Sequence, residues 1–274
     1  MLKNTFIHIP GLGSKREKDL WAKGVMTWDD LAALPNPRLD PNWRADSLKA
    51  WDAQDMDHFA TKLPPKEHWR LAASFPAETI FVDIETTGFS ADYDHITIIG
   101  WSLGGTFKVM VNGRDNPNSF LRDLAKSKAM VTFNGRCFDA KFLIRLFGAN
   151  VLPTAHADLR FLCRVLGWSG GQKNIEAELG LTRQTHVQDG EEAVFLWNQY
   201  VHGRNPAQKK QALRDLIIYN HADIEGMKVI FDACLDRLAE AGLPNQTGLF
   251  AALAATPDFS DPDRFPFSLD LLKK

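Results

Sequence analysis

The middle of the chain alternates short apolar runs with polar segments, a pattern typical of a domain built from strands and helices. The runs rich in β-branched and aromatic residues predict strands at residues 79–84, 95–103, 106–111, 129–133 and 154–157. Gly104-Gly105 predicts a tight hairpin between the second and third strands. Three antiparallel strands followed by helices and strands in alternation indicate an α/β domain with a mixed sheet.

Helical periodicity predicts helices at 119–127 and 139–147, the second ended by Gly148, and a long final helix over 206–239. Composition also changes along the chain. We therefore expect three regions, namely a helical N-terminal module with a linker (1–74), the α/β domain (75–242) and an irregular C-terminal tail (243–274).

Overall composition narrows the class of protein. Hydrophobic residues make up 45% and charged residues 24% of the 274, and no apolar run approaches the roughly 20 residues of a membrane helix, so a soluble protein is expected. The first residues lack the apolar core of a signal peptide, and the three cysteines lack disulfide or zinc spacing, which favours the cytoplasm. A net charge of -2 argues against unspecific duplex binding but not against a nucleic-acid substrate.

Two acids, Asp83 and Glu85, lie at the end of the first apolar run. Residues two apart share one face of a strand, so the two carboxylates point the same way. Their repulsion at about 4 Å is roughly 4 kcal/mol at an effective dielectric of 20, and a bound cation or a shared proton relieves it. Oxygen ligands favour Mg²⁺ or Mn²⁺ over zinc. Taken alone, such a pair at a strand end is more often a chance pattern than a site.

Two later segments carry further acids. Asp139 follows the fourth strand at the start of a helix, where a helix N-cap is the alternative to a site role. Tyr219 and Asp223 are four residues apart, so they lie on one face of the final helix. A buried tyrosine is often plain core, but an acid on the same apolar face is harder to explain that way. His221 is expected at the surface or behind the site.

Together these segments resemble the DnaQ-like 3′-to-5′ exonucleases of the RNase H-like superfamily. Asp83 and Glu85 match the first motif of that family, Asn134 to Asp139 the second, and Tyr219 to Asp223 the third. The tyrosine indicates the DEDDy subgroup, because the histidine of the sister subgroup would stand at position 218, which is Ile218.

A narrower resemblance is to the YprB-type ribonuclease H-like domain. Asp158-Leu159, the stretch Gly170 to Glu176 and the Asn220 beside Tyr219 carry it. The resemblance implies a mixed five-stranded sheet flanked by helices. Lys173 and Asn174 would approach nucleic acid, although a helix start at Asn174 explains them equally well.

The activity that the resemblance implies is metal-dependent 3′-to-5′ hydrolysis of single-stranded DNA or RNA with two divalent cations, Mg²⁺ or Mn²⁺. Asp83 would bridge both ions. Glu85 and Asp223 would complete the ion that holds the attacking water, and Asp139 would serve the other ion. Tyr219 would orient the water through its hydroxyl. The 3′-terminal nucleotide would contact residues after the first motif and within the second: Thr86, Thr87, Gly88, Asn134 and Phe138, with Phe89 and Phe138 as candidates for stacking.

The N-terminal region resembles part of a helix-hairpin-helix element at Ile9-Pro10-Gly11-Leu12-Gly13, although Glu17 departs from the pattern. Contact with DNA and a packing role are both open for this region, and Thr27 with Asp30 fits an ordinary capping box. A rival interpretation of the whole chain is a binding or scaffolding protein that has lost the chemistry. No motif identifies a protein partner.

Overall fold

A mixed sheet forms the centre of the computed structural model, which describes residues 1–35, 39–183, 185–243, 248–250 and 253. The strands of this described part are β1 (Thr79–Thr86), β2 (Ile96–Leu103), β3 (Thr106–Val111), β4 (Ala129–Thr132) and β5 (His156–Asp158). They pair in the order β3-β2-β1-β4-β5. The β1-β2 and β2-β3 pairs are antiparallel, whereas β1-β4 and β4-β5 are parallel. The predicted mixed five-stranded sheet is confirmed.

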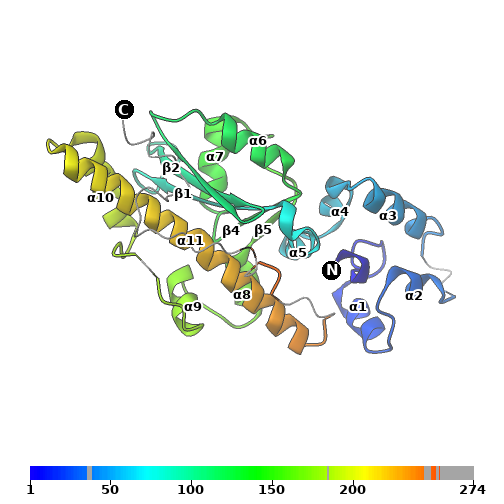
Figure 1. The fold of residues 1–274 in the computed structure, drawn as a ribbon. Coiled ribbons are helices and arrows are strands. Elements are labelled where there is room, and N and C mark those ends of the chain that lie inside the picture. The colour runs from blue at the N-terminus through cyan, green and yellow to red at the C-terminus, as the bar shows by residue number, and fades with distance from the viewer. Residues whose placement is uncertain (36–38, 184, 244–247, 251–252, 254–274) are drawn as a thin grey trace.

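Helices cover both faces of the sheet (Figure 1). Two of them, α6 (Asn118–Lys126) and α7 (Asp139–Phe147), pack on the face formed by Ile80, Val82 and Ile84. The opposite face, which includes Phe81, packs on α11 (Pro206–Glu240). The remaining helices after the sheet are α8 (Leu159–Val165), α9 (Gln172–Glu178) and α10 (Gly190–His202). Apolar residues alternate across β1 because successive side chains of a strand point to opposite faces.

Most predicted bounds of helices and strands agree with the structure to within two residues. Three expectations near the acids differ from the structure: the end of β1, the role of Asp139 and the exposure of His221. Strand β1 continues to Thr86, with a shift in register between Glu85 and Thr86. Asp139 is the first residue of α7 and Phe138 is its cap residue, so the N-cap interpretation of Asp139 was wrong. His221 is not at the surface: it is buried, and its ring packs on Phe107 at a centroid distance of 4.6 Å.

The N-terminal region is helical. Its elements are η1 (Leu2–Asn4), α1 (Ser14–Trp21), α2 (Trp28–Ala32), α3 (Trp43–Asp52), α4 (Met56–Lys62), η2 (Pro65–Glu67), α5 (Trp69–Ser74) and η3 (Pro76–Glu78). The capping box of Thr27 and Asp30 at the start of α2 is confirmed. Buried apolar residues of this region belong to the same hydrophobic cluster as the α11 face of the sheet. Contact of this region with DNA, one of the two roles left open by the sequence, stays a hypothesis.

Three sequence expectations concern the rest of the chain. Most of the predicted irregular tail, 243–274, lies outside the described residues, but Phe250 is buried and stacks on Phe231. Cys163 and Cys234 are free thiols whose sulfur atoms lie 3.7 Å apart, although they are distant in sequence. Within the described ranges, no helix is long and apolar enough to cross a membrane.

Candidate active site

Four acids converge beside the centre of the sheet. Asp83 and Glu85 come from β1, Asp139 from the first turn of α7, which follows β4, and Asp223 from the middle of α11. Because β1, β4 and β5 are parallel, their carboxyl ends meet at one edge of the sheet, the usual position of a site in an open α/β fold. The structure therefore brings together the acids of all three sequence motifs.

The acids are close and poorly solvated. One carboxylate oxygen from each of Asp83, Glu85 and Asp223 lies within 4.8 Å of the others. Burial first, and then the neighbouring acids, raise the pKa of Asp83 and Glu85 well above the usual range. Burial also raises the pKa of Asp139 to about 7, while a backbone hydrogen bond with Ile84 joins this acid to β1. Without a bound cation, such a cluster retains protons at neutral pH because its carboxylates cannot all ionise side by side.

Asn220 fixes the position of Asp83. Its side-chain amide is fully buried and donates a hydrogen bond of 2.7 Å to Oδ2 of Asp83. The approach of α11 depends on Gly100, which faces Asp83 across the β1-β2 ladder. A Cβ atom at Gly100 would lie 1.6 Å from Oδ1 of Asn220. A side chain at position 100 would therefore push Asn220, and with it α11, away from Asp83.

Arg183 is the cation beside Asp223. Its Nη2 atom lies 2.7 Å from Oδ1 of Asp223, and the guanidinium also pairs with Glu176 of α9. Gln172 donates to the backbone oxygen of Asp223 and to Glu176. Gly226 makes room for this arrangement, because a Cβ atom there would lie 1.9 Å from Oε1 of Glu176. Oδ1 of Asp223 is thus already engaged by a positive charge.

Tyr219 lies one turn before Asp223 on α11 and faces the same cleft. The Lys173 ammonium donates to the tyrosine oxygen at 3.1 Å and stands 4.5 Å from the ring centroid. Burial, Asp223 and Glu85 raise the pKa of Tyr219, so its hydroxyl keeps its proton at neutral pH. The neutral hydroxyl is suited to orienting a water molecule rather than to acting as a base.

A cleft of about 570 Å³ opens over the acids. Asn134 and Phe138 line it, as does Phe89, whose side chain is 83% exposed. Thr86 ends β1, and Thr87 and Gly88 follow it in the turn before Phe89: the Thr86 hydroxyl donates to the backbone oxygen of Gly88, and the Thr87 backbone N–H donates to that of His95. These hydrogen bonds hold the turn together and join it to the residue just before β2.

The second motif is held by Asp158 at the end of β5. The Asp158 carboxylate accepts hydrogen bonds from the backbone N–H groups of Asn134, Arg136 and Arg160. Asn134 adopts a φ of 64°, a left-handed conformation that asparagine tolerates better than most residues. Its side-chain oxygen accepts from Arg160 at 2.8 Å, which places this arginine in the wall of the cleft.

A family model described as the RNase H superfamily matches residues 80–235, more than half of the chain. This chain belongs to the RNase H superfamily. The matched span begins in β1 and ends in α11, so it includes all four acids and Tyr219 and excludes the N-terminal helices.

Solved structures of similar fold include one described as the apo form of a nuclease, which is 22% identical over 66% of this chain and 83% of that chain, with a TM-score of 0.38. Brucella melitensis NrnC bound to pGG is 18% identical over 70% of this chain and 84% of its own, with a TM-score of 0.38. The Aedes aegypti Nibbler EXO domain is 12% identical over 68% and 91%, with a TM-score of 0.41. No curated protein matches the chain.

Sequence reasoning missed two contacts of this RNase H superfamily site. Arg183 was not singled out, because it lies outside any recognisable motif and meets Asp223 only through the fold. Arg160 was not considered either. Asn220 was noted only for its place beside Tyr219, and its contact with Asp83 joins two segments that are 137 positions apart.

Proposed function

We propose that this RNase H superfamily member is a metal-dependent 3′-to-5′ exonuclease that hydrolyses single-stranded nucleic acid, of the tyrosine (DEDDy) subgroup and the YprB type. One observation carries the proposal: four acids from three separate segments converge in an open cleft where the described residues supply fewer nearby cations than acids. A fold gains no stability from such a cluster, whereas metal-dependent hydrolysis of a phosphodiester uses one to hold divalent ions.

The donor set fits divalent cations. The nearby atoms of Asp83, Glu85 and Asp223 are carboxylate oxygens, the ligands that Mg²⁺ and Mn²⁺ prefer. The raised pKa of Asp83 and Glu85 indicates charge that a cation would relieve. These three acids and Asp139 would hold two ions, which would supply an activated water and stabilise the charge that develops on the phosphate.

The other residues of the cleft position the reactants. The Tyr219 hydroxyl orients the attacking water through a hydrogen bond, and Lys173 holds the tyrosine oxygen in place. Asn220 keeps Asp83 oriented. Phe89 and Phe138 offer apolar faces to the terminal base, and Arg160 offers positive charge to a phosphate. The cleft opens widely to solvent along Phe89, which suits an unpaired strand end whose base can stack.

The test is hydrolysis of single strands by the purified protein with Mg²⁺, Mn²⁺ or EDTA. A 5′-labelled strand should shorten stepwise, whereas a 3′-labelled strand should release its label in the first step. A 5′-to-3′ enzyme would give the reverse pattern. Strands of DNA and RNA, duplexes and 3′ overhangs compared at equal concentration would identify the preferred substrate.

The same assay separates the enzyme from a binding protein on this fold. A binding protein would retard the labelled strand in a gel without shortening it, with or without Mg²⁺. Failure to shorten any strand with either metal would overturn the proposed function.

A further inference from the structure

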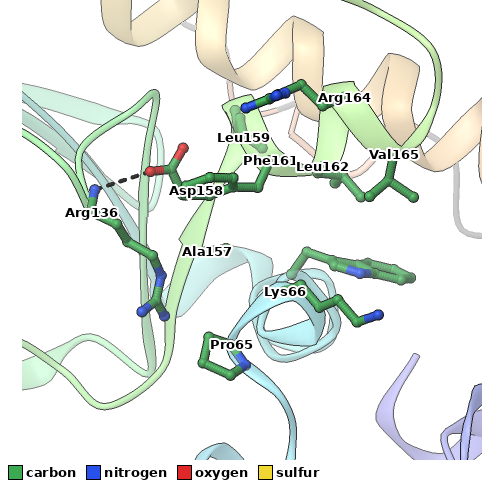
Figure 2. Close-up of a pocket in the computed structure, with 11 residues that line it drawn as sticks. Pro65, Lys66, Arg136, Ala157, Asp158, Leu159, Phe161, Leu162, Arg164 and Val165 are labelled. Atoms are coloured by element: carbon green, nitrogen blue, oxygen red, sulfur yellow. Dashed lines mark hydrogen bonds between the residues drawn. The ribbon is translucent and has the colours of Figure 1, made fainter.

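A second cleft, of about 400 Å³, lies on the α8 side of the second motif (Figure 2). We call it the α8 groove. One wall is α8, and the other is the segment of η2 and α5 that contains Pro65, Lys66 and Trp69. Figure 2 shows Leu162 and Val165 projecting from α8 toward Lys66. The groove therefore joins the N-terminal helices to the domain that carries the four acids.

The walls of the α8 groove are largely apolar, and two of the large apolar side chains of α8 that line it are exposed. Val165 is 71% exposed and Phe161 is 37% exposed, both on the outer side of α8. Large apolar side chains that line a concave surface are a frequent sign of a binding site. A flat aromatic face beside aliphatic side chains is suited to a planar base, because stacking on an aromatic ring requires no particular base sequence.

The charged residues around the groove are mostly cationic. Lys66, Arg136 and Arg164 line it, and Asp158 is the acid among its lining residues. The Asp158 carboxylate is turned toward backbone N–H groups of the second motif, which compensate its charge. Apolar walls with a cationic rim match a nucleotide, in which a base is joined to an anionic phosphate. They match an acidic or purely apolar protein segment less completely.

The α8 groove lies beside the candidate active site. Asn134 and Arg160 line the cleft over the acids, whereas their near neighbours Arg136 and Phe161 line the groove. The two openings thus lie on either side of one short wall, which Asp158 holds rigid by its backbone hydrogen bonds. A strand whose 3′ end occupies the first cleft can reach the groove by crossing this wall.

We propose that the α8 groove binds a nucleotide of the single-stranded substrate upstream of the scissile bond, with its base against Phe161 and Val165 and its phosphate beside Lys66. This inference rests on the proposed function. It gives η2 and α5 a part in substrate binding, and it predicts that affinity increases with strand length.

The test compares the shortest strand that the wild type hydrolyses with a strand of about 15 nucleotides, a length that spans typical single-strand sites. Two variants change the groove: Val165→Glu and Lys66→Glu. Both side chains are exposed, so neither substitution disturbs the core. The control is Lys126→Glu, the same charge change at an exposed position on α6, which packs on the opposite face of the sheet.

For the longer strand, each groove variant should raise KM at least about fivefold, because Val165→Glu weakens one base contact and Lys66→Glu replaces one phosphate contact with repulsion. The kinetics of the shortest strand, and kcat for both strands, should stay unchanged, as should all values for Lys126→Glu. The unchanged short-strand kinetics would also show that the variants are folded.

The outcomes separate this inference from the function on which it rests. If the wild type hydrolyses neither strand, the proposed function fails and the groove assignment fails with it. If it hydrolyses both strands and the groove variants change neither KM, or change both equally, only the groove assignment is overturned, and a protein segment becomes the better occupant.

Discussion

Two regions of this molecule bury charge, and they do so in opposite ways. In the N-terminal helices, the Glu17 carboxylate is almost fully buried and meets Arg70 through two hydrogen bonds, of 2.8 and 3.1 Å. The backbone N–H of Phe6 adds a third at 2.6 Å. At the end of β1, by contrast, Asp83 and Glu85 lie beside a further acid, Asp223.

The contrast separates a structural use of charge from a functional one. Breaking a buried ion pair is costly, but a satisfied pair gives little reason to expect a ligand. Buried acids without sufficient cations raise one another's pKa and weaken the fold, so their presence points to an external cation. If this distinction holds, substitutions in the two regions should affect different quantities.

The largest effect is expected from Asp83→Asn. Loss of this central acid should lower hydrolysis at least about a thousandfold, equivalent to about 4 kcal/mol in the barrier. The fold should not weaken. An acid with a raised pKa destabilises the folded state as pH rises through that pKa, so its removal should increase the melting temperature in EDTA at neutral pH. Retained hydrolysis would contradict the assignment of the site.

Glu17→Gln should have the opposite profile. Arg70 would keep a buried charge without its main partner, so the free energy of unfolding should fall by about 3 to 5 kcal/mol, while hydrolysis per folded molecule stays constant. Glu67→Gln is the matched control, because Glu67 pairs with the same arginine but is more exposed. It should cost about 1 kcal/mol or less. Equal losses in the two variants would show that burial does not decide the value of the pair.

The sequence predicted the sheet and the acids for identifiable reasons. The β-branched run of β1 and the hairpin at Gly104-Gly105 depend on local pattern, and their bounds agree closely with the structure. Asp83, Glu85 and Asp139 were recognised as candidate site residues because they lie at or after the ends of predicted strands. Asp223 was recognised because it interrupts the apolar face of a predicted helix. Their assembly could be anticipated because parallel strands end at one edge of a sheet.

Contacts between distant segments could not be predicted in the same way. Arg183 lies in a stretch without helix or strand periodicity, and its partner Asp223 is forty positions away. The α8 groove depends on how η2 packs beside α8, which no local pattern encodes. The interpretation of Asp139 as an N-cap was wrong because propensity favours Asp at such positions, whereas here the preceding residue takes the cap position and Asp139 faces β1.

Tyr219→Phe tests the uncharged part of the site and should have an intermediate effect. Without the hydroxyl, kcat should fall by about 10- to 100-fold, or about 1.4 to 2.8 kcal/mol, since positioning and proton transfer by one side chain contribute on this order. The Mg²⁺ concentration for half-maximal activity should change little, because the acids are untouched. Tyr200→Phe, the same change on α10, is the control. Unchanged turnover in Tyr219→Phe would show that the hydroxyl takes no part.

The smallest effect is expected at Arg183, which takes part both in a buried ion pair and in the acid cluster. It therefore tests the comparison between the two regions most directly. It pairs with buried Glu176, as Arg70 pairs with Glu17, yet it also holds Oδ1 of Asp223. A cation bound to Asp223 competes with this guanidinium and is repelled by it. Arg183→Met combined with Glu176→Gln removes the Arg183–Glu176 pair without leaving Glu176 as an unpaired buried charge. Calorimetry should then give several-fold tighter Mg²⁺ binding, about 1 kcal/mol. Melting temperature in EDTA should fall, since the acids lose their nearest counter-charge.

Arg44→Met supplies the control for that experiment, because Arg44 forms an exposed pair with Asp29 far from the acids in sequence and should change neither quantity. Weaker Mg²⁺ binding in the double variant would give Arg183 a different part: it would then orient Asp223 for the metal rather than replace the metal. The sign of the change in Mg²⁺ affinity therefore decides between two roles for Arg183. Tighter binding would show that its guanidinium occupies the place of a metal ion at Asp223, and weaker binding would show that it orients Asp223 to bind the ion. Arg70 has no such second role beside Glu17, because the pair of Glu17 and Arg70 is complete without a ligand.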